Sequence, residues 1–261
     1  MLIFFASLLF TFSSHAIENT SHESAIESAS QSFLGKPYLV DPLGEGPSTP
    51  PDTDPVIRFD KFDCQTFVET VLAMAWSSDS QKWKERIIQI RYKSEEVRFD
   101  NRNHFVELDW IQNNTGKKIL KDITSKLFPK DQLETFQTEI IISNIYKPLL
   151  KQNVSSQIPR EEPAKLTVVP LKIFLGNFDI SKIPNASIIV IAHKNWFSKT
   201  LESKLLVSHM GFVFQIGDKT SFRHAARKRQ VEDAPLKDYL LKNYGASQNT
   251  GVLFLQPFPD N

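Results

Sequence analysis

The chain contains one cysteine, Cys64, and a thiol is a side chain suited to covalent acyl-transfer chemistry. Cys64 stands at the head of a predicted amphipathic helix, in the segment FDCQTFVE at 62–69. The unpaired N–H groups and partial positive charge of a helix N-terminus favour a thiolate, so this position predicts a lowered thiol pKa. At the ordinary pKa only about 3% of a thiol is ionised at pH 7. The position alone leaves a second interpretation open, a small buried hydrophobic side chain without chemistry.

A thiol nucleophile needs a general base within hydrogen-bond reach, and the base needs a third group that orients its ring. Four histidines lie beyond the N-terminal segment: His104, His193, His209 and His224. His209 has the best setting, because it lies in a predicted strand with Gly211 next on the same face. His224 follows about one strand and one turn later, so a hairpin could bring the two rings together. Taken alone, His209 could also be a core histidine bonded to a carbonyl, and His224 a surface residue.

The stretch around His224 is basic and contains Arg223, Arg227, Lys228 and Arg229. Such a run usually forms a solvated face, and the alternative is that it binds carboxylates of a substrate. Metal and serine chemistry have less support. The chain lacks His-x-x-x-His and Cys-x-x-Cys spacings, which disfavours a catalytic zinc site, and it lacks a Gly-x-Ser-x-Gly motif.

The composition is that of an ordinary globular protein with a hydrophobic core, at 41% hydrophobic residues in a chain of 261. The 31 Lys and Arg nearly cancel the 30 Asp and Glu, so no overall field attracts nucleic acid or an anionic membrane. These numbers disfavour a nucleic-acid-binding protein and a wholly disordered chain.

Residues 2–12 form an apolar run too short to span a bilayer, and the small residues Ser14 and Ala16 follow it. This pattern predicts a signal peptide at 1–16, although no Lys or Arg precedes the run; an uncleaved anchor or a short buried helix is the alternative. Residues 17–261 then form a single exported domain, periplasmic or secreted, with no further membrane span. A free thiol kept in an oxidising compartment needs a reason, which favours the nucleophile.

The predicted elements change in type along the chain. Prolines and glycines at 41–55 predict a long surface loop, and 91–110 is irregular. Apolar spacing predicts helices that begin at Cys64 and that cover 82–90 and 131–150. Strands are predicted at 187–192, 207–216 and 251–255, with a long loop at 194–206. Helices followed by strands indicate an α+β fold with a mostly antiparallel sheet.

Several short segments, in a fixed order, together resemble one known family. They are LGKPY at 34–38, FDCQTFVE at 62–69, IRY at 90–92, RNHF at 102–105 with Asp109-Trp110, Thr167 to Pro170, SHMGF at 208–212 and His224-Ala225. The set resembles the NlpC-type cysteine peptidase superfamily, and within it the N-acetylmuramoyl-L-alanine amidase-like branch. The resemblance implies a papain-like fold, with the nucleophile at the start of a buried helix packed on the sheet, and with extra helical insertions.

The resemblance also implies a role for particular residues. Cys64 is then the nucleophile, His209 the general base and later acid, and His224 the residue that orients His209. Tyr38 matches a tyrosine that lines the site and helps to hold the oxyanion. Asp63 is either a helix cap or a substrate contact. Arg102 and His104 fall on a branch-specific element assigned to the substrate cleft. One departure from the family pattern is IPNAS at 183–187, where Gly-Asp usually follows Ile-Pro.

The implied reaction is hydrolysis of the amide between the lactyl group of N-acetylmuramic acid and L-alanine, through a thioester and without metal or cofactor. The implied partners are muropeptides, either 1,6-anhydro fragments or intact wall. Three alternatives stay open. The chain could be an endopeptidase that cuts after D-glutamate, a wall-binding module without catalysis, or an exported effector that acts on another cell. The oligomeric state is not indicated.

Overall fold

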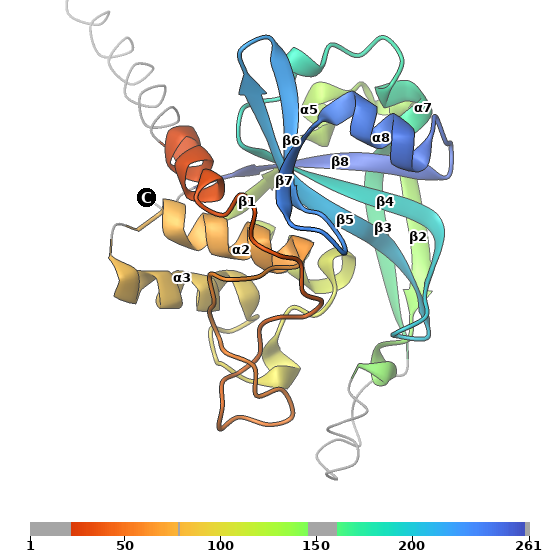
Figure 1. Ribbon diagram of the computed structural model, residues 1–261. Helices are drawn as coiled ribbons and strands as arrows, with labels where there is room; N and C mark the ends of the chain where they lie inside the picture. The colour runs from red at the N-terminus through yellow and green to blue at the C-terminus, as the bar shows by residue number, and fades with distance from the viewer. Residues whose placement is uncertain (1–21, 78, 146–160, 259–261) are drawn as a thin grey trace, which may run out of the picture.

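The computed structural model describes residues 22–77, 79–145 and 161–258. They form an α+β fold in which helices lie against a large antiparallel sheet (Figure 1), so the predicted α+β class with an antiparallel sheet is confirmed. The predicted signal peptide at 1–16 lies outside the described residues, and its cleavage stays a prediction. Within these ranges, every helix is too short or too polar to cross a membrane.

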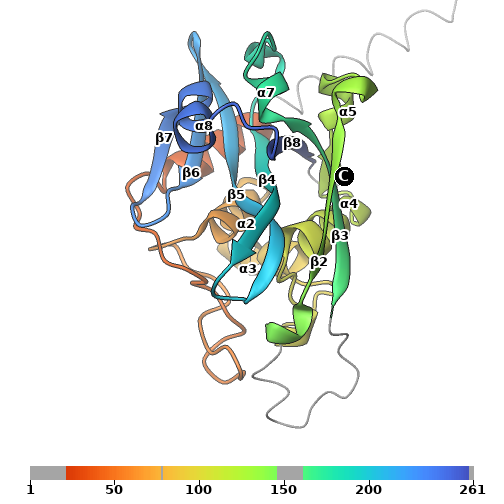
Figure 2. The same ribbon diagram turned by 90° about the vertical axis from the view of Figure 1, so that its right-hand side faces the viewer.

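The sheet arranges its strands in the order β2-β3-β8-β4-β5-β6-β7, and β1 pairs with β8. Every pair of neighbouring strands is antiparallel. The strands are β1 Leu120–Asp122, β2 Glu134–Ile140, β3 Glu162–Pro170, β4 Ser187–Ser198, β5 Ser203–Ile216, β6 Lys219–Ala225, β7 Val231–Pro235 and β8 Thr250–Pro257. Figure 2 shows that the sheet is strongly twisted. The three strands predicted in the C-terminal half are confirmed as parts of β4, β5 and β8.

Two helices predicted from apolar spacing are confirmed as α2 and α3, which lie side by side. The α-helices with described bounds are α2 Cys64–Ala75, α3 Ser80–Arg91, α4 Ile111–Gly116, α5 Thr124–Leu127, α7 Leu171–Phe174 and α8 Leu236–Tyr244. Short helical turns are η1 Phe99–Asn101, η2 Val106–Trp110, η3 Lys130–Gln132, η4 Ile142–Asn144 and η5 Ile180–Lys182. The irregular stretch predicted at 91–110 therefore contains a 3-10 turn and a π-helical turn.

A separate hydrophobic core lies on each face of the sheet. Alternate residues of β4 divide between them, with Ile188 and Val190 packed in the core that contains Phe67 of α2. Ile189 and Ile191 face the other core, which contains residues of α7 and α8. Because both faces of β4 are buried from Ser187 to Ala192, this part of its sequence is a nearly continuous apolar run without the alternation of a half-exposed strand. This burial fixes the sheet beneath the N-terminal end of α2.

The helix predicted at 131–150 is wrong where the structure describes it, since residues 134–140 form strand β2 paired with β3. Phe136 and Ile140 are the two buried residues of this strand. Their spacing of four places them on one face of a helix and also on one face of a strand, so the apolar pattern could not separate the two. Pairing with β3 decided the conformation.

The long loop predicted at 194–206 is also wrong. Strand β4 continues to Ser198 and β5 begins at Ser203, so only residues 199–202 connect them. The two strands pair as a ribbon, with Trp196 opposite Leu205 and irregular register on either side of Ala192. Polar residues in this ribbon hid the strands in the sequence, because one of its faces is exposed to solvent.

Candidate active site

Asp63 caps helix α2 and thereby places Cys64 at its first position. The Asp63 carboxylate accepts a hydrogen bond of 2.8 Å from the Thr66 N–H, and Thr66 Oγ1 accepts one of 3.0 Å from the Asp63 N–H. The other carboxylate oxygen of Asp63 accepts the N–H of Asp41 at 3.1 Å. This capping box confirms the helix-cap interpretation of Asp63, while a contact with substrate stays a prediction.

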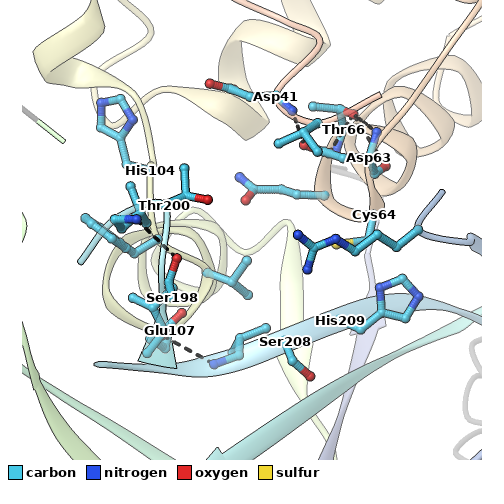
Figure 3. A pocket seen from close by; sticks show the side chains of 18 of the residues that line it. Asp41, Asp63, Cys64, Thr66, His104, Glu107, Ser198, Thr200, Ser208 and His209 are labelled. Atoms are coloured by element: carbon cyan, nitrogen blue, oxygen red, sulfur yellow. Dashed lines mark hydrogen bonds between the residues drawn. The ribbon is translucent and has the colours of Figure 1, made fainter. Parts of the chain in front are cut away.

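Cys64 opens into a cavity of about 630 Å³ between the start of α2, strand β5 and the loops that precede α2. Six of the seven site residues assigned from the sequence line it, namely Tyr38, Asp63, Cys64, Arg102, His104 and His209, whereas His224 does not. Figure 3 shows Cys64 and His209 on the same side of the cavity, with His104 on the other side. The structure thus brings the proposed nucleophile and the proposed base to one cavity, although they lie far apart in the sequence.

The thiol of Cys64 is not acidified, contrary to the prediction from its place at a helix N-terminus. Burial raises the pKa of Cys64 to about 12, and the negative charge of Asp63 raises it further. Backbone N–H groups of Met210, Gln65 and Cys64 itself lower the pKa, but they do not compensate for lost hydration. In the free protein at neutral pH the thiol is therefore protonated, and catalysis needs a base that removes its proton.

This protonation state predicts how Cys64 reacts with iodoacetamide. Only the thiolate is alkylated, so we expect the rate to rise about tenfold for each pH unit between pH 6 and 9, without a plateau. Intact-protein mass spectrometry measures the rate, and Cys64→Ala gives the background because the chain has no other cysteine. A plateau that begins near pH 7 would contradict the raised pKa.

His209 and His224 form a hydrogen-bonded pair of rings, as the predicted hairpin between their strands allows. His209 Nε2 lies 2.7 Å from His224 Nδ1, and β5 pairs directly with β6. Burial lowers the pKa of His209 to about 4, while burial and the neighbouring His209 lower the pKa of His224 to about 2. Both rings are neutral at pH 7. When His209 donates through Nε2, its Nδ1 keeps a lone pair that can accept a proton from a thiol.

Another histidine that lines this cavity, His193, is held by two hydroxyl groups. Its Nε2 lies 2.7 Å from Ser208 Oγ, and its Nδ1 lies 3.0 Å from Thr250 Oγ1. Ser208 reaches it because of a β-bulge: Ile191 pairs with His209 and Ala192 with Val207, so Ser208 has no Cα partner. With both ring nitrogens occupied, His193 is a poor base for Cys64.

Two aromatic residues that sequence reasoning missed hold the histidine pair in place. Phe222 stacks on His224 with ring centroids 4.3 Å apart, and Tyr239 of α8 meets the same ring at 4.7 Å. Tyr239 also lines the cavity and lies 6.3 Å from the His209 ring. Phe222 precedes His224 by two residues, so the period of two would have pointed to it once His224 was taken to lie on the second strand of a hairpin. No comparable signal pointed to Tyr239.

Gly211 lets β5 approach β6 closely where the histidine pair forms. A Cβ at this position would lie 2.6 Å from the Arg223 carbonyl oxygen and 2.8 Å from His224 Cβ. We therefore expect Gly211→Ala to lower the free energy of unfolding by about 3 kcal/mol and to reduce activity, since the two strands must separate. Urea denaturation measures the change. The control is Gly116→Ala, where a Cβ meets nothing within 4 Å, and equal stability of the two variants would contradict the close-approach argument.

Tyr38 lies at the rim of the cavity beside Cys64. Its backbone N–H donates to the Arg229 carbonyl at 3.0 Å, and it forms an isolated bridge with Phe62 next to the capped helix. Burial raises the pKa of Tyr38, and the neighbouring Cys64 and Asp63 raise it further. The phenol therefore stays protonated and can donate a hydrogen bond into the cavity.

Arg102 and His104 line the cavity but are already bound to the protein. Arg102 Nη1 donates to the Leu43 carbonyl at 2.8 Å and lies 2.9 Å from the Asp52 carboxylate. It thereby holds the proline-rich segment at 41–55, which lacks helix and strand as predicted but is not all on the surface, because Leu43 is fully buried. His104 Nε2 lies 2.6 Å from the Phe99 carbonyl oxygen. Contacts of these two side chains with substrate stay predictions.

In the ranges that the structure describes, no three His, Cys, Asp or Glu side chains gather in a way that could hold a metal ion. Cys64, His209 and His224 are therefore not arranged as the ligands of a metal ion.

Comparisons with known proteins identify a family for the chain and solved structures that are similar to it. A family model described as AmiA-like, N-acetylmuramoyl-L-alanine amidase-like, matches residues 28–246. A solved structure from Legionella pneumophila, of family DUF1460, is 26% identical with a TM-score of 0.82, covering 94% of this chain and 92% of that chain. An N-acetylmuramoyl-L-alanine amidase from Bacteroides uniformis is 22% identical with a TM-score of 0.67, covering 91% of this chain and 99% of that chain, which shows a shared fold. No curated protein matches the chain by sequence.

Proposed function

The chain belongs to the N-acetylmuramoyl-L-alanine amidase-like family, and we propose that it hydrolyses the amide between the lactyl group of N-acetylmuramic acid and L-alanine. The observation that carries this proposal is that Cys64 and His209 line one cavity, with His224 behind His209 at 2.7 Å from its ring. A cysteine at a helix start followed in the chain by a strand histidine also supports a place in the papain-like NlpC-type superfamily. The substrates are muropeptides, and the reaction needs no metal ion.

In the first half of the reaction, His209 accepts the thiol proton as Cys64 attacks the amide carbonyl, so that a carbon–sulfur bond forms. Burial keeps His209 neutral at pH 7 and therefore able to accept this proton. The carbonyl oxygen becomes an oxyanion beside the N-terminus of α2. The Cys64 N–H and the Tyr38 hydroxyl are the donors we assign to it. Collapse breaks the carbon–nitrogen bond, and protonated His209 gives its proton to the leaving amine of L-alanine.

In the second half, water attacks the thioester carbonyl while His209 accepts a proton from that water. Collapse breaks the carbon–sulfur bond, His209 returns its proton to Cys64, and the lactyl group leaves as a carboxylic acid that loses its remaining proton to solvent. His224 orients the His209 ring through their 2.7 Å contact and stabilises the positive charge that His209 carries in both halves. The buried setting of this pair excludes water that would compete for the shared hydrogen bond.

The predicted signal peptide at 1–16 supports export, and we propose that residues 17–261 act in the periplasm or outside the cell. Cell-wall fragments are found there, and so is the oxidising environment in which a lone free thiol needs a function. Amino-terminal sequencing of the protein recovered from its native cell tests the cleavage, with Ile17 expected as the first residue.

Mass spectrometry of digested muropeptides tests the proposed bond. We expect the wild-type protein to release N-acetylmuramic acid free of peptide, together with a stem peptide that begins with L-alanine. A sugar that retains a dipeptide would instead identify an endopeptidase that cuts after D-glutamate. Binding without any cleavage would identify a wall-binding module. Activity should survive EDTA, because no step of the proposed reaction uses a metal ion.

A further inference from the structure

Two of the four cations in the basic run near His224 form ion pairs within the protein. Arg223 is 3% exposed and donates two hydrogen bonds of 2.8 Å to the Asp233 carboxylate. Arg229 Nη2 lies 2.9 Å from the Glu232 carboxylate. The interpretation of this run as a face exposed to solvent therefore fails for the buried Arg223, and the charges of Arg223 and Arg229 are both paired with carboxylates of the protein. Arg227 and Lys228 remain to be explained.

Of these two, Arg227 lines the cavity that contains Cys64. It is exposed, and among the described residues it forms no ion pair. Two other arginines line the same cavity, but both are almost fully buried. Arg102 is bound by Asp52 and by the Leu43 carbonyl, and Arg91 donates to the same carbonyl at 2.6 Å. Arg227 is thus the guanidinium group of this cavity that can meet a ligand from solvent.

The backbone around Arg227 is held against the reactive centre. The turn after β6 closes with hydrogen bonds of 2.9 Å from the Ala226 N–H to the Gln230 carbonyl and from the Arg229 N–H to the Ala226 carbonyl. The Tyr38 N–H donates to the Arg229 carbonyl at 3.0 Å, which joins this turn to the segment beside Cys64. The positive charge of Arg227 is felt at the Tyr38 phenol, whose pKa it lowers against the larger opposing effect of burial.

We propose that Arg227 binds a carboxylate of the substrate and thereby sets a preference for an acidic group on the peptide side of the scissile amide. The inference rests on the proposed function. A guanidinium forms two parallel hydrogen bonds with a carboxylate, in a geometry that a lysine ammonium cannot reproduce. In a muropeptide the residue after L-alanine is glutamate, joined to the next residue through its side chain, so its α-carboxylate is free. That group lies about two residues, or roughly 7 Å, from the scissile bond.

Two substrates that differ at this one group test the proposal: a muramoyl dipeptide with a free α-carboxylate and its counterpart with the α-carboxamide. We expect the wild-type protein to cleave the acid with a kcat/KM about 10- to 100-fold higher than the amide. Arg227→Gln should remove this preference by losing activity on the acid and little on the amide. Arg227→Lys should retain part of it. Lys228→Gln is the matched control, since Lys228 shares the turn but does not line the cavity, and it should retain the full preference.

Equal losses on both substrates in Arg227→Gln would overturn the proposal, because the side chain would then serve the fold or the reaction in general. An unchanged preference in that variant would overturn it as well. Calorimetric titration of the Cys64→Ala protein with the dipeptide L-Ala–D-Glu and with its carboxamide gives a readout without turnover. Tighter binding of the acid that depends on Arg227 supports the proposal. Failure of the wild type to cleave either substrate counts against the proposed function instead.

Discussion

Replacing Cys64 by alanine lowers the kcat of amide hydrolysis by about 10⁴- to 10⁶-fold and leaves the fold intact. The effect is this large because the thiol supplies the bond-forming atom, and no other cysteine exists in the chain to substitute for it. The cavity and the N–H groups at the start of α2 remain, so weak residual catalysis through bound water is the most that should survive. Steady-state kinetics on muropeptides measures the loss.

Two controls show whether this loss is chemical. The melting temperature of Cys64→Ala should stay within a few degrees of the wild type, since the Asp63 cap does not involve the thiol. Binding of the uncleaved muropeptide should also persist, because the side chains that line the cavity are unchanged. Cleavage at the wild-type rate by Cys64→Ala would contradict the cysteine mechanism altogether and would require another nucleophile.

Replacing His209 by alanine lowers kcat by about 10⁴-fold, because the protonated thiol loses the base that activates it. The raised pKa of Cys64, about 12, makes this dependence stronger than it would be for a thiol that ionises unaided. The double variant Cys64→Ala with His209→Ala should be no less active than Cys64→Ala alone, since the two residues act in one step. If the loss in the double variant equalled the product of the two single losses, Cys64 and His209 would not act in the same step.

The pH profile gives a second measure of His209. Burial lowers the pKa of His209 to about 4, so the ring is in its basic form throughout the neutral range. We expect kcat/KM to fall as the pH drops through an apparent pKa below 6.5, when protonation removes the lone pair that accepts the thiol proton. His193→Gln is the matched control, since it removes another histidine from the same cavity, and its activity should fall less than tenfold. A larger loss in His193→Gln than in His209→Ala would reassign the base.

The sequence placed the proposed catalytic residues on the correct elements for identifiable reasons. Asp63 before an apolar helical pattern marks a helix cap, so Cys64 had to be the first helical residue. The β-rich run at 207–216 marked most of β5, and the place of His224 about one strand and one turn later made its pairing with His209 a hairpin prediction. Signals of this kind depend on residues close together in the chain, so they predict the element correctly without any knowledge of tertiary contacts.

The same local signals failed where neighbours distant in the sequence decided the outcome. Phe136 and Ile140 share a face in either conformation, and only pairing with β3 made their segment a strand. Conversely, the ribbon of β4 and β5 beyond Ala192 has an exposed, polar face that resembles a loop in sequence. In both segments the hydrogen bonds that stabilise the strand come from another part of the chain, which no local pattern records.

The residue types and their order along the chain were thus enough to identify Cys64, His209 and His224 as candidates for the nucleophile, its base and the orienting residue. Each of these roles needs a particular side chain on a particular element. Only the tertiary structure decided how those groups behave. It placed the half-buried Cys64 beside Asp63, away from bulk water, and so kept the thiol protonated. It also occupied both nitrogens of His193 and left Arg227 open to the cavity. Hydration, pairing and charge at a site depend on which distant residues surround it, and folding determines those neighbours.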